Sequence, residues 1–238
     1  MNKSMKKVLS SSVVALAMLT LCSCMHVHWS KNKSALAEEQ RPLSGFERIE
    51  LLGSLDVKYQ QADSFSVLVK APAKVMKDVE TRLEGNKLVI NMKFDGELIN
   101  FGVADSDDVT VYVTSPDFLG ITLKGSGDFE CKYPLDTDTL DINLKGSGDI
   151  EFGDIICDRV NVSLTGSGDV EVKTVKTRSS RVSLVGSGDV KMRFDDSGPV
   201  ESNLTGSGDI TLMGTVSECK SNVRGSGEIH TDKLRINN

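Results

Sequence analysis

The residues best suited to chemistry in this 238-residue chain are acids that follow glycine-serine-glycine triplets. The first copy reads "LKGSGDFE", and five more copies follow it. A glycine-rich loop that ends in a carboxylate can cradle a phosphate, ligate calcium, present a catalytic acid or simply turn the chain. The candidate residues are Gly125, Gly127, Asp128, Gly146, Gly148, Asp149, Gly166, Gly168, Asp169, Gly186, Gly188, Asp189, Gly206, Gly208, Asp209, Gly225, Gly227 and Glu228.

Phosphate binding and nucleophilic catalysis do not fit this pattern. A phosphate loop leads from a strand into a helix and usually carries a lysine, whereas each copy here leads into another alternating, strand-like segment. A serine nucleophile needs a positioned base, and the repeat region has one histidine, His230 in the last copy. We therefore predict no catalytic residues and no cofactor, and we interpret His230 as a surface residue.

The acids occupy one position per repeat and are expected to stack, so their like charges must be compensated. An aspartate after glycine can accept a hydrogen bond from a turn amide of its own or a neighbouring repeat. Calcium is the alternative, but calcium-binding Gly/Asp-rich nonapeptide repeats supply ligands from both halves of each turn. One carboxylate per repeat favours turn capping over specific calcium binding, with nonspecific cation screening as a third option. We predict no metal site.

The spacing of the triplets predicts the fold. Their first glycines are separated by 21, 20, 20, 20 and 19 residues, and apolar residues alternate on both sides of each triplet. Alternation indicates two short strands per unit, each with one buried face and joined at a glycine corner. Units of this length suit the coils of an all-β solenoid, in which like residues line up from coil to coil.

Residues 45–120 also carry strand patterns, without the regular repeat. "VETRLEGNKLVINMK" predicts a hairpin that turns at Gly85 and Asn86, and "AKVMKD" is the one segment that favours a helical turn. "GSLDV" at 53–57 resembles a degenerate repeat in which Leu55 replaces the second glycine. We assign 45–120 to irregular N-terminal coils and 121–238 to the GSGD repeats.

The N-terminus resembles a bacterial lipoprotein signal. Three lysines precede the apolar run "VVALAMLTL" and then "LCSC", which is similar to a lipobox that is cut before Cys24 and acylated there. Leu21 makes Cys22 a poorer candidate, and a plain secretory signal is the alternative. We predict a signal peptide at 1–23, a flexible tether at 24–44 and a β-helix domain at 45–238.

Location and metal binding by the tether are less well specified. Met25 follows the anchor cysteine, which by resemblance to other lipoproteins favours the outer membrane, facing either the periplasm or the exterior. His26 and His28 could share a metal ion, but two ligands on a mobile strand make a weak site, and a solvated tether is favoured.

Charge and cysteine content exclude some classes of protein. Removing 1–23 leaves 25 basic and 34 acidic residues, a net charge near −9, which disfavours nucleic acid as a partner. Cys131, Cys157 and Cys219 show no metal-ligand spacing and are interpreted as small buried apolar residues, although one pair could form a disulfide.

The combination of "FERIELLGSLDVKYQ", "TSPDFLGITLKGSGDFE" and serial "GSGD" units resembles the auto-transporter adhesin head domain family of Bacteroidetes. The resemblance covers about residues 45–238. It implies a right-handed β-helix, similar in shape to pectin lyases but without their catalytic residues, and a role in cell adhesion.

These observations predict a non-enzymatic, membrane-anchored envelope protein that binds an unknown protein or glycan. A carbohydrate-active enzyme is the alternative, but Asp195 and Asp196, its paired carboxylates, fit a turn better. Self-association through coil ends is a further option, against which Lys233 and Arg235 could guard. Binding is expected to involve the residues that vary just before each corner, namely Lys124, Lys145, Thr165, Val185, Thr205 and Arg224.

Overall fold

The computed structural model of the chain describes residues 36–93 and 109–237. Strands dominate this part of the chain, and its one helical element is the 3₁₀ turn η1 (Met76–Asp78), within the predicted "AKVMKD" segment. In the same residues, no helix has the length and apolarity needed to cross a membrane. The predicted signal peptide, with Cys24, lies outside the described residues.

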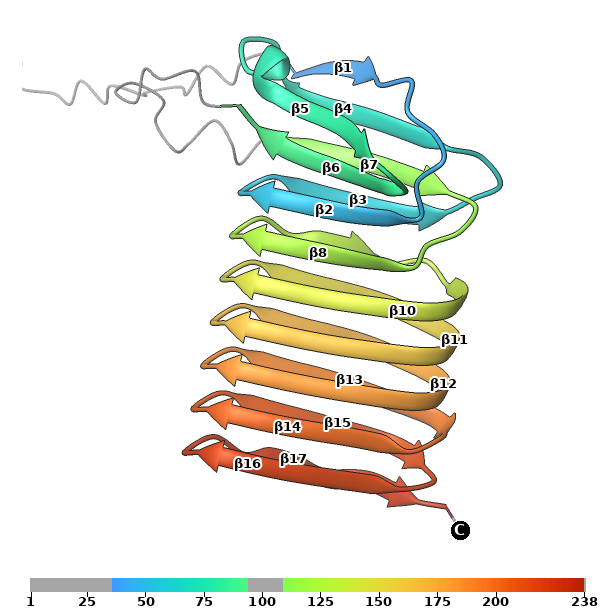
Figure 1. The fold of residues 1–238 in the computed structure, drawn as a ribbon, viewed down its shortest axis with the longest axis vertical. Coiled ribbons are helices and arrows are strands. Elements are labelled where there is room, and N and C mark those ends of the chain that lie inside the picture. Colours follow the sequence, from blue (N-terminus) through green and yellow to red (C-terminus); the bar gives the residue numbers. More distant parts are fainter. Residues whose placement is uncertain (1–35, 94–108, 238) are drawn as a thin grey trace, which may run out of the picture. The chain divides into compact units, whose positions relative to one another are not determined.

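The strands form a flattened solenoid with two faces, as the repeat spacing predicted (Figure 1). Face A is the run of paired strands β5 (Val79–Glu84), β6 (Lys87–Met92), β2 (Arg48–Gly53), β8 (Gly120–Gly125), the C-terminal halves of β10 (Leu135–Gly146), β11 (Asp149–Gly166) and β12 (Asp169–Gly186), β14 (Val200–Gly206) and β16 (Cys219–Gly225).

Face B lies behind face A, and the chain passes from A to B at each glycine corner (Figure 1). It is the run of β1 (Leu36–Gln40), β4 (Ser66–Pro72), β7 (Thr110–Ser115), β3 (Asp56–Gln61), β9 (Phe129–Cys131), the N-terminal halves of β11 and β12, β13 (Asp189–Ser197), β15 (Asp209–Val216) and β17 (Ile229–Ile236).

Parallel pairing between coils is the rule in the repeat region, and antiparallel pairing occurs at the N-terminal end. β5 and β6 form the predicted hairpin, in which Glu84 pairs with Lys87 across the Gly85–Asn86 turn. β4 pairs antiparallel with both β1 and β7. These N-terminal strands extend both faces beyond the first coil, so the hydrophobic core does not end at β2 and β3.

The strand β1 corrects the predicted tether boundary. Residues 36–40 lie inside the segment 24–44 that we expected to be a flexible tether, yet they pair along their whole length with β4. The sequence "LAEEQ" has little periodicity and a mostly exposed burial pattern, which is why alternation does not reveal it. Pairing with the edge of β4 orders it instead.

The core lies between the two faces. Inward residues repeat in columns, such as Leu123, Leu144, Leu164, Leu184 and Leu204 on face A. Aliphatic residues fill most of it, but the N-terminal coils also bury a stacked aromatic group made of Tyr59, Phe118, Phe129 and Phe152. Burial of alternate residues on both faces accounts for the period-two patterns around each triplet.

The glycine corners stack so closely that side chains are excluded from them. A Cβ on Gly146 would lie less than 3.0 Å from the carbonyl oxygen of Gly125, and the other repeat corners show the same approach. Gly146 also has φ +146°, in a region that favours glycine. Leu55, which takes the place of the second glycine in the first corner, is buried in the core.

Replacing Gly146 by valine should therefore destabilise the fold. We expect Gly146→Val to lower the free energy of unfolding by about 3 kcal/mol or more, because a β-branched residue would push its Cβ into the Gly125 carbonyl. Denaturant unfolding followed by circular dichroism measures this. The control Lys145→Val, at the adjacent exposed position, should change stability by about 0.5 kcal/mol or less. Equal unfolding midpoints for the two variants would contradict this account.

Candidate functional site

The backbone amides of each corner bind the coil before it. The Gly125 carbonyl accepts hydrogen bonds from Ser147 N–H at 2.9 Å and Gly148 N–H at 3.3 Å, and the later corners repeat this arrangement. A phosphate loop leaves such amides free for its ligand. Here the amides are engaged within the fold, so the triplets act as structural corners.

The acids of the repeats form a ladder of side-chain to backbone hydrogen bonds. Asp149 Oδ1 accepts the N–H of Asp169 at 3.1 Å, and Asp169 Oδ1 accepts the N–H of Asp189 at 3.0 Å. The ladder begins at Asp56 and ends with Asp209 accepting from Glu228. Each carboxylate thus caps the backbone of the following coil, which is the neighbour-capping alternative that the sequence left open.

A metal site or a catalytic site at the ladder would need clustered metal-ligand residues or a base near the acids. In the described residues, no group of three or more His, Cys, Asp or Glu side chains could hold a metal ion. His230 lies 3.8 Å from both Asp209 and Glu228, with 41% of its side chain exposed. It is a partly exposed residue beside the end of the ladder.

The six residues just before the corners line up on face A, as expected from the repeat. Lys124 pairs in register with Lys145, Lys145 with Thr165, and the column continues to Arg224. Every member is exposed. The column therefore presents a mixed series of side chains to solvent, with basic residues at both ends.

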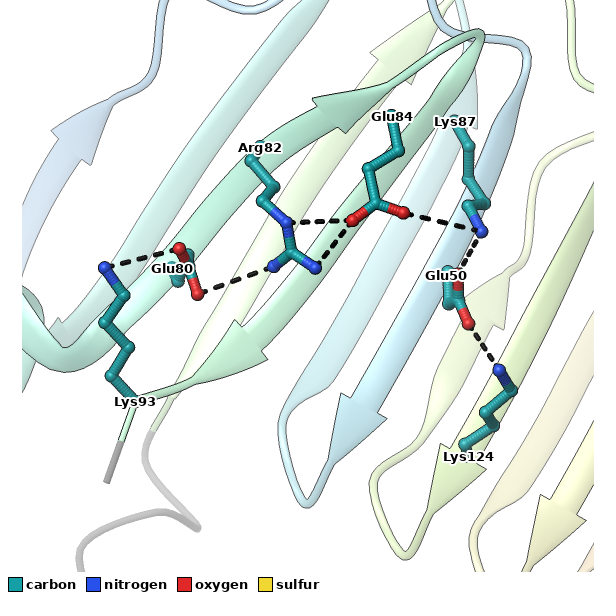
Figure 2. Close-up of polar contacts among 7 residues, drawn as sticks. All are labelled: Glu50, Glu80, Arg82, Glu84, Lys87, Lys93 and Lys124. Atoms are coloured by element: carbon teal, nitrogen blue, oxygen red, sulfur yellow. Dashed lines mark hydrogen bonds and ion pairs between the residues drawn. The ribbon is translucent and has the colours of Figure 1, made fainter. Parts of the chain in front are cut away.

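A buried carboxylate joins the first coil to its neighbours on face A. Glu50 of β2 is 8% exposed, and it binds Lys87 of β6 on one side and Lys124 of β8, at 2.6 Å, on the other (Figure 2). Hydrogen bonds from Lys124 and Lys87 lower the pKa of Glu50 against the opposing effect of burial. Glu50 therefore holds three strands together as an anion.

The same ionic network continues onto the hairpin. Lys87 lies 4.0 Å from Glu84, and Arg82 pairs with both Glu84 and Glu80 (Figure 2). These side chains are more exposed than Glu50, so each pair contributes little alone. The network is best explained as a clamp on the N-terminal strands.

The three cysteines of the domain are free. Cys131 and Cys157 are buried, and burial raises the pKa of both thiols, to about 12 for Cys131. Buried thiols with raised pKa values are poor nucleophiles and poor metal ligands. Cys219 is half-buried, so only two of the three fit the buried apolar interpretation.

Asp195 and Asp196 lie at the corner opposite the glycines. Asp196 has φ +46°, typical of a turn, and both side chains are exposed.

In the last coil, Val223 and Ile236 are 42% and 51% exposed. Assembly through coil ends, with or without protection by Lys233 and Arg235, stays a prediction.

Sequence reasoning missed a hollow of about 430 Å³ on face A. The hollow lies beside the corner opposite the glycines, which we call the far corner. It adjoins four consecutive coils and includes Ser179, Pro199 and the neighbouring charged residues. The interruption "DDSGP" at 195–199, which replaces the usual far-corner sequence, is the signal that could have drawn attention to it.

The chain is a two-faced β-solenoid with glycine corners, and its sequence matches a known family at residues 45–174 and 162–238. That family is described as "Putative auto-transporter adhesin, head GIN domain". The chain belongs to this family, which confirms the resemblance drawn from its motifs. No curated protein matches the chain.

Solved structures of Bacteroidetes proteins have a similar fold. An adhesin-like protein of Bacteroides fragilis has 21% identity and a TM-score of 0.67, with 82% of this chain and 96% of that chain covered. A Parabacteroides distasonis protein, described as lipid binding, has 20% identity and a TM-score of 0.59, with 84% and 97% covered. At these identities the likeness establishes the fold.

The aspartate ladder yields a test that separates capping from cation binding. Asp169→Ala should lower the free energy of unfolding by about 1 kcal/mol, because the Asp189 N–H loses its acceptor. Asp169→Asn keeps an acceptor oxygen and removes one like charge, so it should be at least as stable as the wild type. Denaturant midpoints measured in EDTA and in calcium check this. Equal losses in the two variants, together with stabilisation of the wild type by calcium, would contradict capping.

The Glu50 clamp predicts a defined pH dependence. Because its folded-state pKa is lowered, its contribution is complete above the ordinary carboxyl pKa of 4.5 and is lost as pH falls through the folded value. Glu50→Gln should lower the free energy of unfolding by about 2 kcal/mol at pH 7. The difference from the wild type should shrink below about pH 4. A difference that is constant from pH 7 to pH 3 would exclude the ionic clamp.

Proposed function

We propose that this protein is a non-enzymatic lipoprotein of the cell envelope, anchored through Cys24, that acts as an adhesin or interaction scaffold. Its partner would be a protein or a glycan bound by outward side chains of the solenoid. Family membership supports the adhesin role, and the "LCSC" motif after an apolar run supports the anchor.

One structural observation gives the main support for this proposal. In the described residues, the corner amides and the aspartate carboxylates that recur from coil to coil are engaged in coil-to-coil hydrogen bonds. The outward columns differ from the corners, because each column combines exposed side chains of several types on a regular sheet. A regular frame with a varied surface is suited to recognising a partner.

The anchor is testable by metabolic labelling of cells with a palmitate analogue. We expect label on the wild-type protein and on Cys22→Ala, and none on Cys24→Ala, because acylation needs the cysteine that follows the cleavage site. Cys22→Ala is the matched control, since it removes the neighbouring thiol alone. Label retained in Cys24→Ala would refute the assigned site.

Exposure on the cell is tested by protease treatment of intact cells. An adhesin must face the exterior, so the protein should be degraded while a periplasmic marker survives. Protection equal to that of the periplasmic marker would contradict the adhesin role and favour an interaction scaffold inside the envelope.

A further inference from the structure

The hollow at the far corner lies between two columns of outward side chains. The corner column consists of Arg159, Ser179, Pro199 and Glu218, and the sheet column consists of Asn161, Arg181, Glu201 and Lys220. Between them, Ser180 and Val200 turn inward and provide the floor. The hollow thus runs from coil to coil, across the strands.

Side-chain size explains why the surface is hollow at this point. Ser179 and Pro199 are short residues in the middle of the corner column, whereas Arg159 and Glu218 at its ends are long. The backbone that leads into Pro199 is specialised, because Asp196 has φ +46° and a Cβ on Gly198 would collide with the Arg178 carbonyl. A volume of about 430 Å³ falls within the range of small-ligand pockets.

The charges around the hollow are only partly compensated. Arg181 pairs with Glu201 at 2.9 Å and Lys220 with Glu218 at 3.0 Å, both at exposed positions. In the part of the chain that the structure describes, Arg159 has no carboxylate within ion-pair distance. One end of the hollow therefore offers a free guanidinium, which binds a carboxylate through two parallel hydrogen bonds.

Recognition here must use side chains, because the strands beneath are interior to the sheet. β12 pairs with β11 on one side and with β14 on the other, so its backbone groups cannot receive an added peptide strand. What remains is a set of hydroxyl, amide, carboxylate and cationic groups. Such a set suits a ligand rich in hydroxyl groups, each of which both donates and accepts.

The floor of the hollow contains a buried serine that stability alone does not explain. Ser180 occupies a column whose neighbours are Val160 and Val200, and it is 6% exposed. Its Oγ has no hydrogen-bond partner in the described structure, and a valine would avoid burying an unsatisfied hydroxyl. The polar residue lies directly under the hollow.

We propose that this far-corner hollow binds an acidic oligosaccharide. The carboxylate of one sugar residue lies against the Arg159 guanidinium, with Ser179 beside it, and the hydroxyls of that residue and the next meet the Arg181–Glu201 and Lys220–Glu218 pairs in the following coils. The site gives the proposed adhesin a ligand class, and its biological role rests on that proposed function.

Calorimetric titration of the full chain, purified in detergent, tests the site. The probes are trigalacturonate, a hyaluronan tetrasaccharide and sialyllactose, with fully methyl-esterified trigalacturonate as the uncharged control. We expect at least one acidic probe to bind and the methyl ester to bind at least tenfold more weakly. Binding of none of the three acidic probes, or equal binding of the ester, would overturn the proposal.

Two variants locate the binding on the surface. Arg159→Ala should weaken it about tenfold or more, because it removes a charge-assisted hydrogen-bond pair. Arg178→Ala is the matched control: Arg178 is exposed, pairs with Asp158 and does not line the hollow, so affinity should stay within about twofold. Equal losses in both variants would indicate nonspecific attraction and contradict the site.

The site and the adhesin role can fail separately. Specific binding by a protein that proteases cannot reach on intact cells would leave the site standing and reject adhesion. A surface-exposed protein that binds none of the acidic probes would reject the site and leave adhesion to another surface.

Discussion

In each repeat corner, the glycine carbonyl of one coil lies where a side chain on the next coil's glycine would begin. This close approach lets two corner amides of the next coil reach that carbonyl. It also fixes the register of both faces, because the strands start from the corner in the same phase. The alignment of the core columns and the outward columns therefore depends on backbone contact at the corners.

The aspartates add hydrogen bonds to each corner, and all of these bonds run in the same direction along the stack. Each carboxylate accepts from the amide of the following coil, so the negative charges are balanced by backbone dipoles along the stack. Glu228, the last acid, has the Nδ1 of His230 3.8 Å from its carboxylate. A serial pattern of this kind explains why glycine and aspartate recur together at fixed positions in each corner.

The sequence predicted the parts of the fold that repeat or that follow local turn chemistry. Regular spacing placed Gly146 against Gly125, and the Gly85–Asn86 turn placed β5 against β6. It could not predict that Glu50 meets Lys87 and Lys124, because such pairs depend on which strands become neighbours. The alternation of β4 is the same for parallel and antiparallel pairing, so its partners were equally hidden.

The surface was the least predictable part. The column before the glycine corners is exposed as expected, but the hollow lies at the opposite corner, where coil length and register change. Its shape depends on the sizes of Ser179 and Pro199 beside longer neighbours, which periodicity does not encode. The hollow thus coincides with the point at which the repeat is interrupted.

Amide hydrogen exchange, measured by NMR in EDTA on the wild type and on Asp149→Ala, tests the structural role of the corners most directly. If each aspartate caps the following coil, the Asp169 amide will exchange faster in the variant, while the Asp149 amide, held by Asp128, stays protected. Protection that vanishes from both amides in EDTA, or that is unchanged at Asp169 in the variant, would contradict the account.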